Sequence, residues 1–119
     1  MTIRFTELDE FERDKHHLRK YRHIEEDILV FRQALVTNPT GLSGVFEISE
    51  KDRKFKNCIY KAKKFRSRDI PNKGSQSGFR IIYHYDNTCE LIILIEIYHK
   101  SEQQDYNRDR LIKHFPLNQ

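Results

Sequence analysis

The chain has 119 residues and a mass of 14.5 kDa, which is the length of one ordinary domain. Hydrophobic residues make up 37% and charged residues 34%, so the chain is polar but apolar enough to fold. No apolar run approaches the roughly 20 residues that a membrane span needs, and residues 1–10 lack an apolar signal-peptide region. Cys58 and Cys89 form neither a zinc pattern nor a disulfide framework. We therefore expect a single soluble domain, residues 1–119, in the reducing cytoplasm, without a membrane partner.

The positive charge is concentrated in one part of the chain. The formal net charge is only +4, but residues 51–73 hold ten Lys or Arg side chains against two Asp. Such a segment binds polyanions readily, because Lys and Arg neutralise phosphates and release counterions. A solvated basic face is the competing interpretation.

The first half of the chain is predicted to be mostly helical. Residues 3–6 alternate and indicate a short strand. Apolar residues then recur near the 3.6-residue period over 8–21, with Thr6 as the expected N-cap. A second helix is predicted over 24–35, because its first turn is acidic and favours the helix dipole. We expect the two helices to form an antiparallel hairpin.

The second half is predicted to be mostly strands. The segment 38–41 contains Pro and Gly and ends the second helix, and a loop is expected over 41–56. Strands are predicted over 57–65, 78–85 and 90–98, the last two paired as an antiparallel hairpin.

The last strand has two apolar faces, which is typical of a central strand. Two-residue alternation predicts Leu91, Ile93, Ile95 and Ile97 on one face, and Ile92, Leu94, Glu96 and Tyr98 on the other. Helices are expected to cover one side and something partly polar the other. A last short helix is expected within 101–114, capped by Ser101 and docked through Leu111 and Ile112. The sequence thus predicts an α+β domain of order β-α-α-β-β-β-α, with a helical hairpin on a mostly antiparallel sheet.

Reactive side chains are concentrated in three places on this sheet. Lys61 and Lys63 share a face of the first long strand, a turn and strand carry Lys73 to Arg80, and the last strand ends in residues 98–100. Neither a carboxylate pair, a Ser-His-Asp group, a Walker loop nor a metal-ligand cluster accompanies them. Such a set suits metal-free RNA cleavage, because that reaction needs proton transfer and fixed positive charge around a phosphorane.

Two groups of candidate site residues follow. The expected catalytic residues are Arg80, Tyr98, His99 and Lys100, and the expected phosphate-binding residues are Lys61, Lys63, Arg66, Arg68 and Lys73; we expect neither metal nor cofactor. Each has a plainer interpretation: a buried ion pair for Arg80, an aromatic anchor for Tyr98 and a surface position for His99. Arg66 and Arg68, like Lys64, are either solvated or contact a phosphate without chemistry.

Three motifs together resemble a known family. They are Tyr60-Lys61-Ala62-Lys63, the run from Lys73-Gly74-Ser75-Gln76-Ser77-Gly78 to Phe79-Arg80-Ile81-Ile82-Tyr83, and Ile97-Tyr98-His99-Lys100-Ser101-Glu102. With the two preceding helices, they resemble the RelE/ParE superfamily of type II toxins, in particular its RelE/HigB branch. The resemblance matches Lys61 and Lys63 with the family's basic pair, Arg80 with its strand arginine, and residues 98–100 with its catalytic cluster.

The resemblance implies a toxin that enters the ribosomal A site and cuts mRNA. The implied partners are mRNA, the ribosome with its 16S rRNA, and a cognate antitoxin protein that silences the toxin. Two alternatives remain open: a ParE-like toxin that poisons DNA gyrase without being a nuclease, and an inactive relative that only binds RNA.

Overall fold

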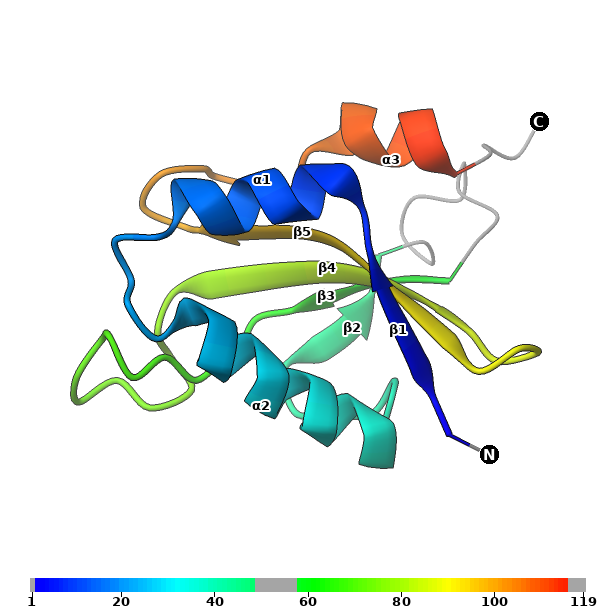
Figure 1. Ribbon diagram of the computed structural model, residues 1–119, viewed down its shortest axis with the longest axis horizontal. Helices are drawn as coiled ribbons and strands as arrows, with labels where there is room; N and C mark the ends of the chain where they lie inside the picture. The colour runs from blue at the N-terminus through cyan, green and yellow to red at the C-terminus, as the bar shows by residue number, and fades with distance from the viewer. Residues whose placement is uncertain (1, 49–57, 116–119) are drawn as a thin grey trace.

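The computed structural model describes residues 2–48 and 58–115, and these form three helices and a five-stranded mixed sheet (Figure 1). In chain order the elements are β1 (Arg4–Glu7), α1 (Asp9–His17), α2 (Ile24–Thr37), β2 (Val45–Glu47), β3 (Ile59–Ala62), β4 (Phe79–Asp86), β5 (Leu91–His99) and α3 (Arg108–His114). The predicted α+β class is confirmed. No helix in these two ranges is long and apolar enough to cross a bilayer.

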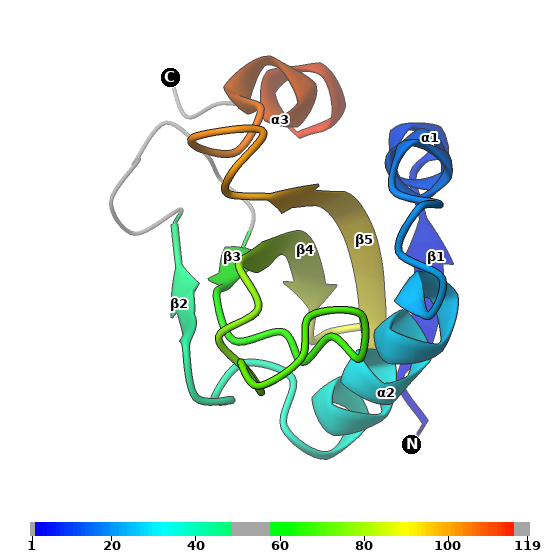
Figure 2. The same cartoon turned by 90° about the vertical axis from the view of Figure 1, so that its left-hand side faces the viewer.

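The sheet has the strand order β1-β5-β4-β3-β2, with β1 and β2 at its two edges (Figure 2). Every pairing is antiparallel except that of β1 with β5, which is parallel. The sheet is therefore mostly antiparallel, as predicted, and the predicted hairpin of the last two strands is β4 with β5. Of the predicted site residues, β4 carries Arg80 and β5 carries Tyr98 and His99.

Each face of the sheet is covered by its own helices. The helices α1 and α2 run in opposite directions and splay apart over one face (Figure 1). They bury Phe11, Leu18, Ile28, Phe31 and Leu35 against Phe65, Phe79, Ile81, Tyr83, Ile92 and Leu94. The helix α3 covers the opposite face, where Leu111 and Phe115 pack with Ile59, Ile82, Ile95 and Tyr98. A fully buried side chain of this size contributes about 1.5–3 kcal/mol, so both layers stabilise the sheet.

The edge strand β2 lies where a loop was predicted. Val45 pairs with Ala62 and Glu47 with Tyr60, so even this short, half-exposed segment finds a partner strand. Its three residues are too few to show an alternating pattern. The strand predicted over 57–65 is shorter in the structure, Ile59–Ala62, and residues 49–57 lie outside the described part of the chain.

Three predicted helix boundaries were wrong. Leu8, not Thr6, occupies the N-cap of α1, because Thr6 belongs to β1 and pairs with Ile93. That helix ends at His17 instead of extending to residue 21. The last helix begins at Arg108, and Asn107 is its cap, accepting a hydrogen bond from the Arg110 backbone N–H. Ser101 is no cap, because it lies seven residues before α3 begins.

A bulge in β5 overturns the predicted faces of that strand. Ile82 lies opposite Glu96 and Tyr83 opposite Leu94, so Ile95 is the extra residue. Beyond the bulge the alternation is inverted. Ile92, Leu94 and Ile97 face α1 and α2, while Ile93, Ile95 and Tyr98 pack on the α3 side. The bulge therefore places Tyr98 on the same face as Ile95, which simple alternation would not do.

Side chains from both helical layers form hydrogen bonds with backbone groups at the bulge. The Asp14 carboxylate accepts the Ile97 backbone N–H at 3.1 Å, and Arg110 Nη1 donates to the Ile95 carbonyl at 2.9 Å. Asp14 and Arg110 also pair with each other at 2.7 and 3.1 Å. One ion pair thus connects α1, β5 and the start of α3.

Glu96, next to the bulge, is a buried carboxylate with a testable pH signature. It accepts hydrogen bonds from the Asn107 backbone N–H and the Gln103 side-chain amide, both at 2.8 Å. Burial nevertheless raises the pKa of Glu96 above 4.5. A raised pKa means that the folded state binds this proton more tightly than the unfolded state, so ionised Glu96 destabilises the fold at neutral pH.

The substitution Glu96→Gln should therefore increase the free energy of unfolding at pH 7, because the amide removes the buried charge and keeps an acceptor. The gain should shrink as the pH falls through the raised pKa of Glu96, because the folded protein then holds this carboxyl in its neutral form. Urea unfolding of both proteins at several pH values measures this difference. A gap that stays constant or widens on acidification would contradict the assignment.

Candidate anion-binding site

A pocket of about 250 Å³ lies where β3 ends, β4 begins and β5 ends. Its lining residues are Lys63, Lys64, Gln76, Gly78, Arg80 and Lys100, which include four cations and no carboxylate. The cations come from three separate segments of the chain. The structure therefore brings together three of the predicted site residues, Lys63, Arg80 and Lys100. Such a set of fixed positive charges suits a phosphate group.

Arg80 reaches this pocket because β4 is a regular strand. Phe79 and Ile81 enter the core beneath α1 and α2, so Arg80 between them emerges on the opposite face. Its guanidinium makes one long hydrogen bond, 3.5 Å, from Nη1 to the Lys63 carbonyl. Lys100 is placed beside it by a backbone hydrogen bond of 2.9 Å to the Gly78 carbonyl. Among the contacts with residues 2–48 and 58–115, most of the Arg80 donors thus remain available for a ligand.

Tyr98 and Lys61 lie on the same face but outside the pocket. Tyr98 pairs with Arg80 in the β4–β5 ladder and is only 5% exposed, and its hydroxyl finds no partner among the described residues. Burial raises the pKa of Tyr98 above its usual range, so the phenol stays protonated at neutral pH. Lys61 Nζ is engaged by Asp105 at 3.0 Å. Neither side chain is therefore among the residues that line the pocket.

His99 lies on the other face of the sheet, packed against Phe79 and Tyr21. Its Nε2 is 2.9 Å from the Ser77 carbonyl, which can only accept, so Nε2 carries the proton. Nδ1 then accepts from the Ser101 backbone N–H at 3.1 Å and is 2.7 Å from the Ser101 hydroxyl. Both ring nitrogens are occupied. His99 is thereby placed to position the turn that carries Gly78 rather than to contact a ligand.

Gly78 is the point where this turn and His99 meet. Its φ is +95°, and a Cβ at this position would lie 2.7 Å from His99 Nε2. We expect Gly78→Ala to reduce the free energy of unfolding by about 2 kcal/mol, from backbone strain and from displacement of the imidazole. Urea unfolding measures the loss.

Gly74→Ala is the matched control, because Gly74 also has a positive φ, +55°, but its Cβ would meet nothing nearer than 3.8 Å. It should cost about 1 kcal/mol. Equal losses in the two variants would show that the His99 contact contributes nothing to stability.

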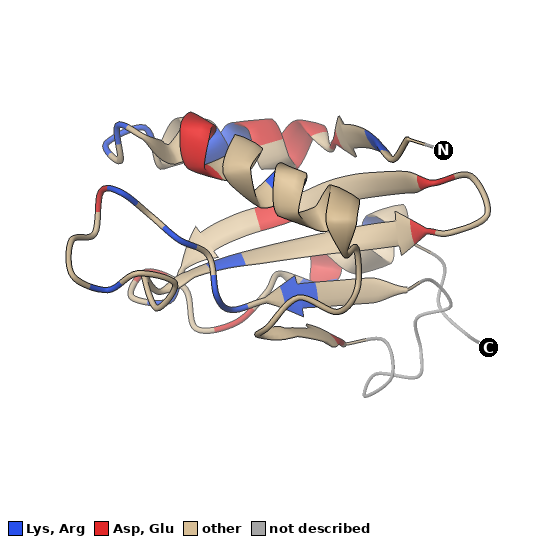
Figure 3. Cartoon of the chain, turned by 90° about the horizontal axis from the view of Figure 1, so that it is seen from below, with Lys and Arg blue, Asp and Glu red and all other residues tan. Residues whose placement is uncertain are grey.

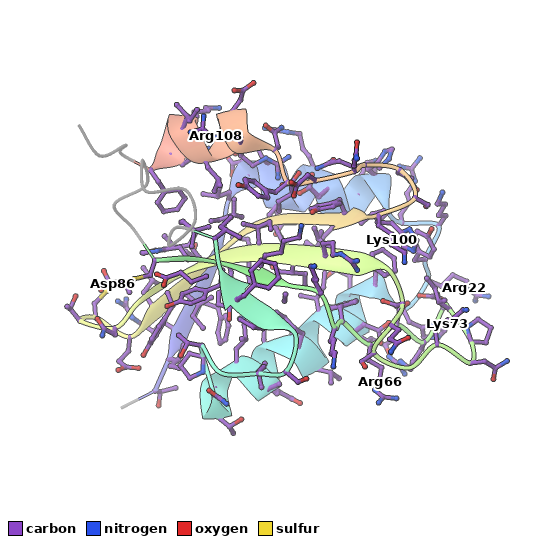
Figure 4. All side chains as sticks on the ribbon, turned by 180° about the vertical axis from the view of Figure 1, so that it is seen from behind. Arg22, Arg66, Lys73, Asp86, Lys100 and Arg108 are labelled. Carbon is purple, nitrogen blue, oxygen red and sulfur yellow. The ribbon has the colours of Figure 1, made fainter. Side chains whose placement is uncertain are left out.

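The remaining predicted residues flank the pocket without lining it. Arg68 is held by Asp27, at 3.1 Å from Nε to Oδ1, and by Glu26, which attaches the β3–β4 segment to α2. Arg66 lines a separate groove, and Lys73 is exposed. Figure 3 marks several Lys and Arg positions in blue along this segment, and Figure 4 shows Arg66, Lys73 and Lys100 at one end of the molecule, with Asp86 at the other.

Lys64 and Gln76 line the pocket although neither was among the expected site residues; for Lys64 the sequence had left a phosphate contact open. Lys64 follows the end of β3 at Ala62, so strand alternation cannot place it. Gln76 lies in the turn before β4, where no periodic pattern exists. No three His, Cys, Asp or Glu side chains within residues 2–48 and 58–115 are arranged to hold a metal ion.

Comparisons with known proteins found no matching family model, no matching curated protein and no matching solved structure.

Proposed function

We propose that this protein is an endoribonuclease that cleaves mRNA without a metal, as the toxin of a type II toxin–antitoxin system. The observation that carries the proposal is the pocket lined by Lys63, Lys64, Arg80 and Lys100, with no carboxylate among its lining residues. The resemblance of the strand and turn motifs to RelE/HigB toxins supports the same chemistry. The basic β3–β4 segment gives a longer RNA further positive charge to follow.

The pocket suits phosphoryl transfer from the leaving 5′-oxygen to the neighbouring ribose 2′-hydroxyl. Arg80 and Lys63 hold the nonbridging oxygens and stabilise the negative charge that grows on the phosphorane. The 2′-oxygen bonds to phosphorus and its proton passes to water, while the bond to the 5′-oxygen breaks. Lys100 gives the 5′-oxygen a proton and is reprotonated from water. The products are a 2′,3′-cyclic phosphate and a 5′-hydroxyl.

The partners of this activity are mRNA, the translating ribosome with its 16S rRNA, and an antitoxin protein. A disordered, acidic antitoxin segment that folds on the basic surface would inhibit by covering it. The proposed activity takes place in the cytoplasm.

Primer extension on a defined mRNA tests the proposal, with the purified protein added in EDTA-containing buffer to naked RNA and in translation buffer to ribosomes. Cuts that appear only with ribosomes would support A-site cleavage. Cuts on naked RNA would keep the nuclease and remove its ribosome dependence. A protein that arrests growth, cuts neither substrate and induces the DNA damage response would favour gyrase poisoning instead.

RNA binding without cleavage is a second candidate, and the engagement of both His99 nitrogens favours it. A set of short fluorescein-labelled RNAs, each with one 2′-deoxy substitution at a different position, separates the two without a known cut site. If the protein only binds, the deoxy forms and the all-ribo form should behave alike, with equal anisotropy and no fragments. Fragments that disappear only when the 2′-deoxy position is at the cut would support the nuclease.

A further inference from the structure

A groove separate from the cation pocket runs between α2 and the segment that leads into β2. Its volume is about 330 Å³. Five apolar side chains form most of its wall, and polar and charged side chains form the rest: Val30, Phe31, Ala34, Leu42 and Val45, with Asp27, Ser43, Lys64, Arg66 and Ser75. A groove of this size accommodates several aliphatic side chains of a peptide.

The groove wall continues onto the exposed side of α2 through Val30, which is 57% exposed. Leu29 and Val36 are also exposed, at 53% and 44%, which is unusual for aliphatic residues on one helix of a small domain. They lie three residues before and four residues after Arg32, so they share the face of α2 from which Arg32 reaches the Phe5 ring at 4.5 Å, away from Val30. Exposed apolar surface beside a groove is typical of an interaction site.

The charges around the groove select the kind of partner. Lys64 Nζ donates to the neutral Ser43 hydroxyl at 3.0 Å, and within residues 2–48 and 58–115 neither Lys64 nor Arg66 has a carboxylate partner. The carboxylate of Asp27 is already engaged, because Arg68, which also pairs with Glu26, donates to it from Nε and from its backbone N–H. The groove thus combines an apolar wall with two available cations.

We propose that this groove docks an amphipathic helical segment of a partner protein, with aliphatic side chains on one face and carboxylates beside them. The aliphatic side chains fill the space between Val30, Ala34 and Leu42, and the carboxylates pair with Lys64 and Arg66. A basic segment would be repelled, and a purely polar segment would leave the apolar wall exposed to water.

Docking has a consequence for the cation pocket, because Lys64 lines both the groove and the pocket. A partner carboxylate on Lys64 removes one of four positive charges from the phosphate site. The docked segment therefore weakens RNA binding from one side, without entering the pocket. This consequence rests on the proposed function, whereas the docking itself does not.

The test uses a fluorescein-labelled synthetic helical peptide of about 14 residues, with Leu at i, i+3, i+4 and i+7 and Glu elsewhere. Anisotropy titration of the full chain should give saturable binding, and NMR shift changes should be centred on Val30, Ala34, Leu42 and Val45. Val30→Glu should weaken binding by about tenfold or more, because it places a carboxylate in the apolar wall. Ile112→Glu, the same change at an exposed position of α3, should leave binding unaltered.

Two further peptides test the chemistry, one with Lys in place of every Glu and one with Ser in place of every Leu; neither should bind. No binding of the Leu/Glu peptide at about 1 mM, equal binding of the Lys peptide, or shifts confined to Arg80 and Lys100 would each overturn the proposal. A self-associated chain that Val30→Glu dissociates in sedimentation would also overturn it, by assigning the groove to a second copy. Because these measurements contain no RNA, their failure is distinguishable from failure of the nuclease proposal.

Discussion

The variant Arg80→Ala should lose about 100-fold or more of its RNA cleavage rate while keeping its fold. Arg80 is the strand arginine of the pocket, and within the described part of the chain its guanidinium makes only a long contact with the Lys63 carbonyl. Fixed donors aimed at a developing negative charge typically contribute 10²–10³-fold to catalysis, so the phosphorane loses a main source of stabilisation. Fragment formation in single-turnover reactions measures the effect.

Two variants make this result specific. Arg80→Lys keeps the charge but loses the forked donor geometry, so its rate should lie between those of the parent and Arg80→Ala. Arg13→Ala removes an exposed arginine of α1, outside the pocket, and should cleave at the parent rate. An Arg80→Ala protein that cleaves within threefold of the parent would mean that the pocket does not hold the scissile phosphate.

Two-residue alternation predicted correctly which face of the sheet carries Arg80, because the extra residue of the bulge lies in β5 and the alternation of β4 is uninterrupted. Phe79, Ile81 and Tyr83 enter the same core, so the residues between them must face the other way. The same logic failed in β5. A bulge adds one residue without changing the composition of the strand, and the apolar character of both faces hides the shift. Tyr98 and Ile95 therefore share a face, whereas simple alternation predicted them on opposite faces.

The sequence could indicate which residues are reactive but not which contacts already occupy them. Histidine is a residue type that commonly transfers protons, yet the two ring nitrogens of His99 are engaged by Ser77 and Ser101. Arg68 belongs to the basic segment, yet Asp27 and Glu26, far away in the chain, hold it. Such pairings depend on which helix crosses which strand end, and no local pattern records that. The net charge of a segment therefore overstates how many of its cations are available to bind RNA.

The substitution with the largest expected effect on stability is Asp14→Ala, at a loss of about 3 kcal/mol. The side chains of Asp14 and Arg110 are only 17% and 12% exposed, and their pairing raises the pKa of Arg110 despite its burial. Removing Asp14 leaves a half-buried guanidinium without its partner and the Ile97 backbone N–H without an acceptor. Breaking a buried pair from one side costs about 3–5 kcal/mol, and residual exposure places this pair at the lower end.

Urea unfolding of Asp14→Ala measures this loss, and Lys113→Ala provides the surface control. Lys113 pairs with Glu10 at 3.3 Å, but its side chain is 67% exposed, so its removal should cost no more than about 1 kcal/mol. Asp14→Asn should lie between the two, because the amide oxygen still accepts the Ile97 N–H while the charge is lost. Losses of the same size in Asp14→Ala and Lys113→Ala would mean that the sheet holds the bulge without help from α1 and α3. The inverted face of β5, and with it the placement of Tyr98 opposite Arg80, would then depend on strand pairing alone.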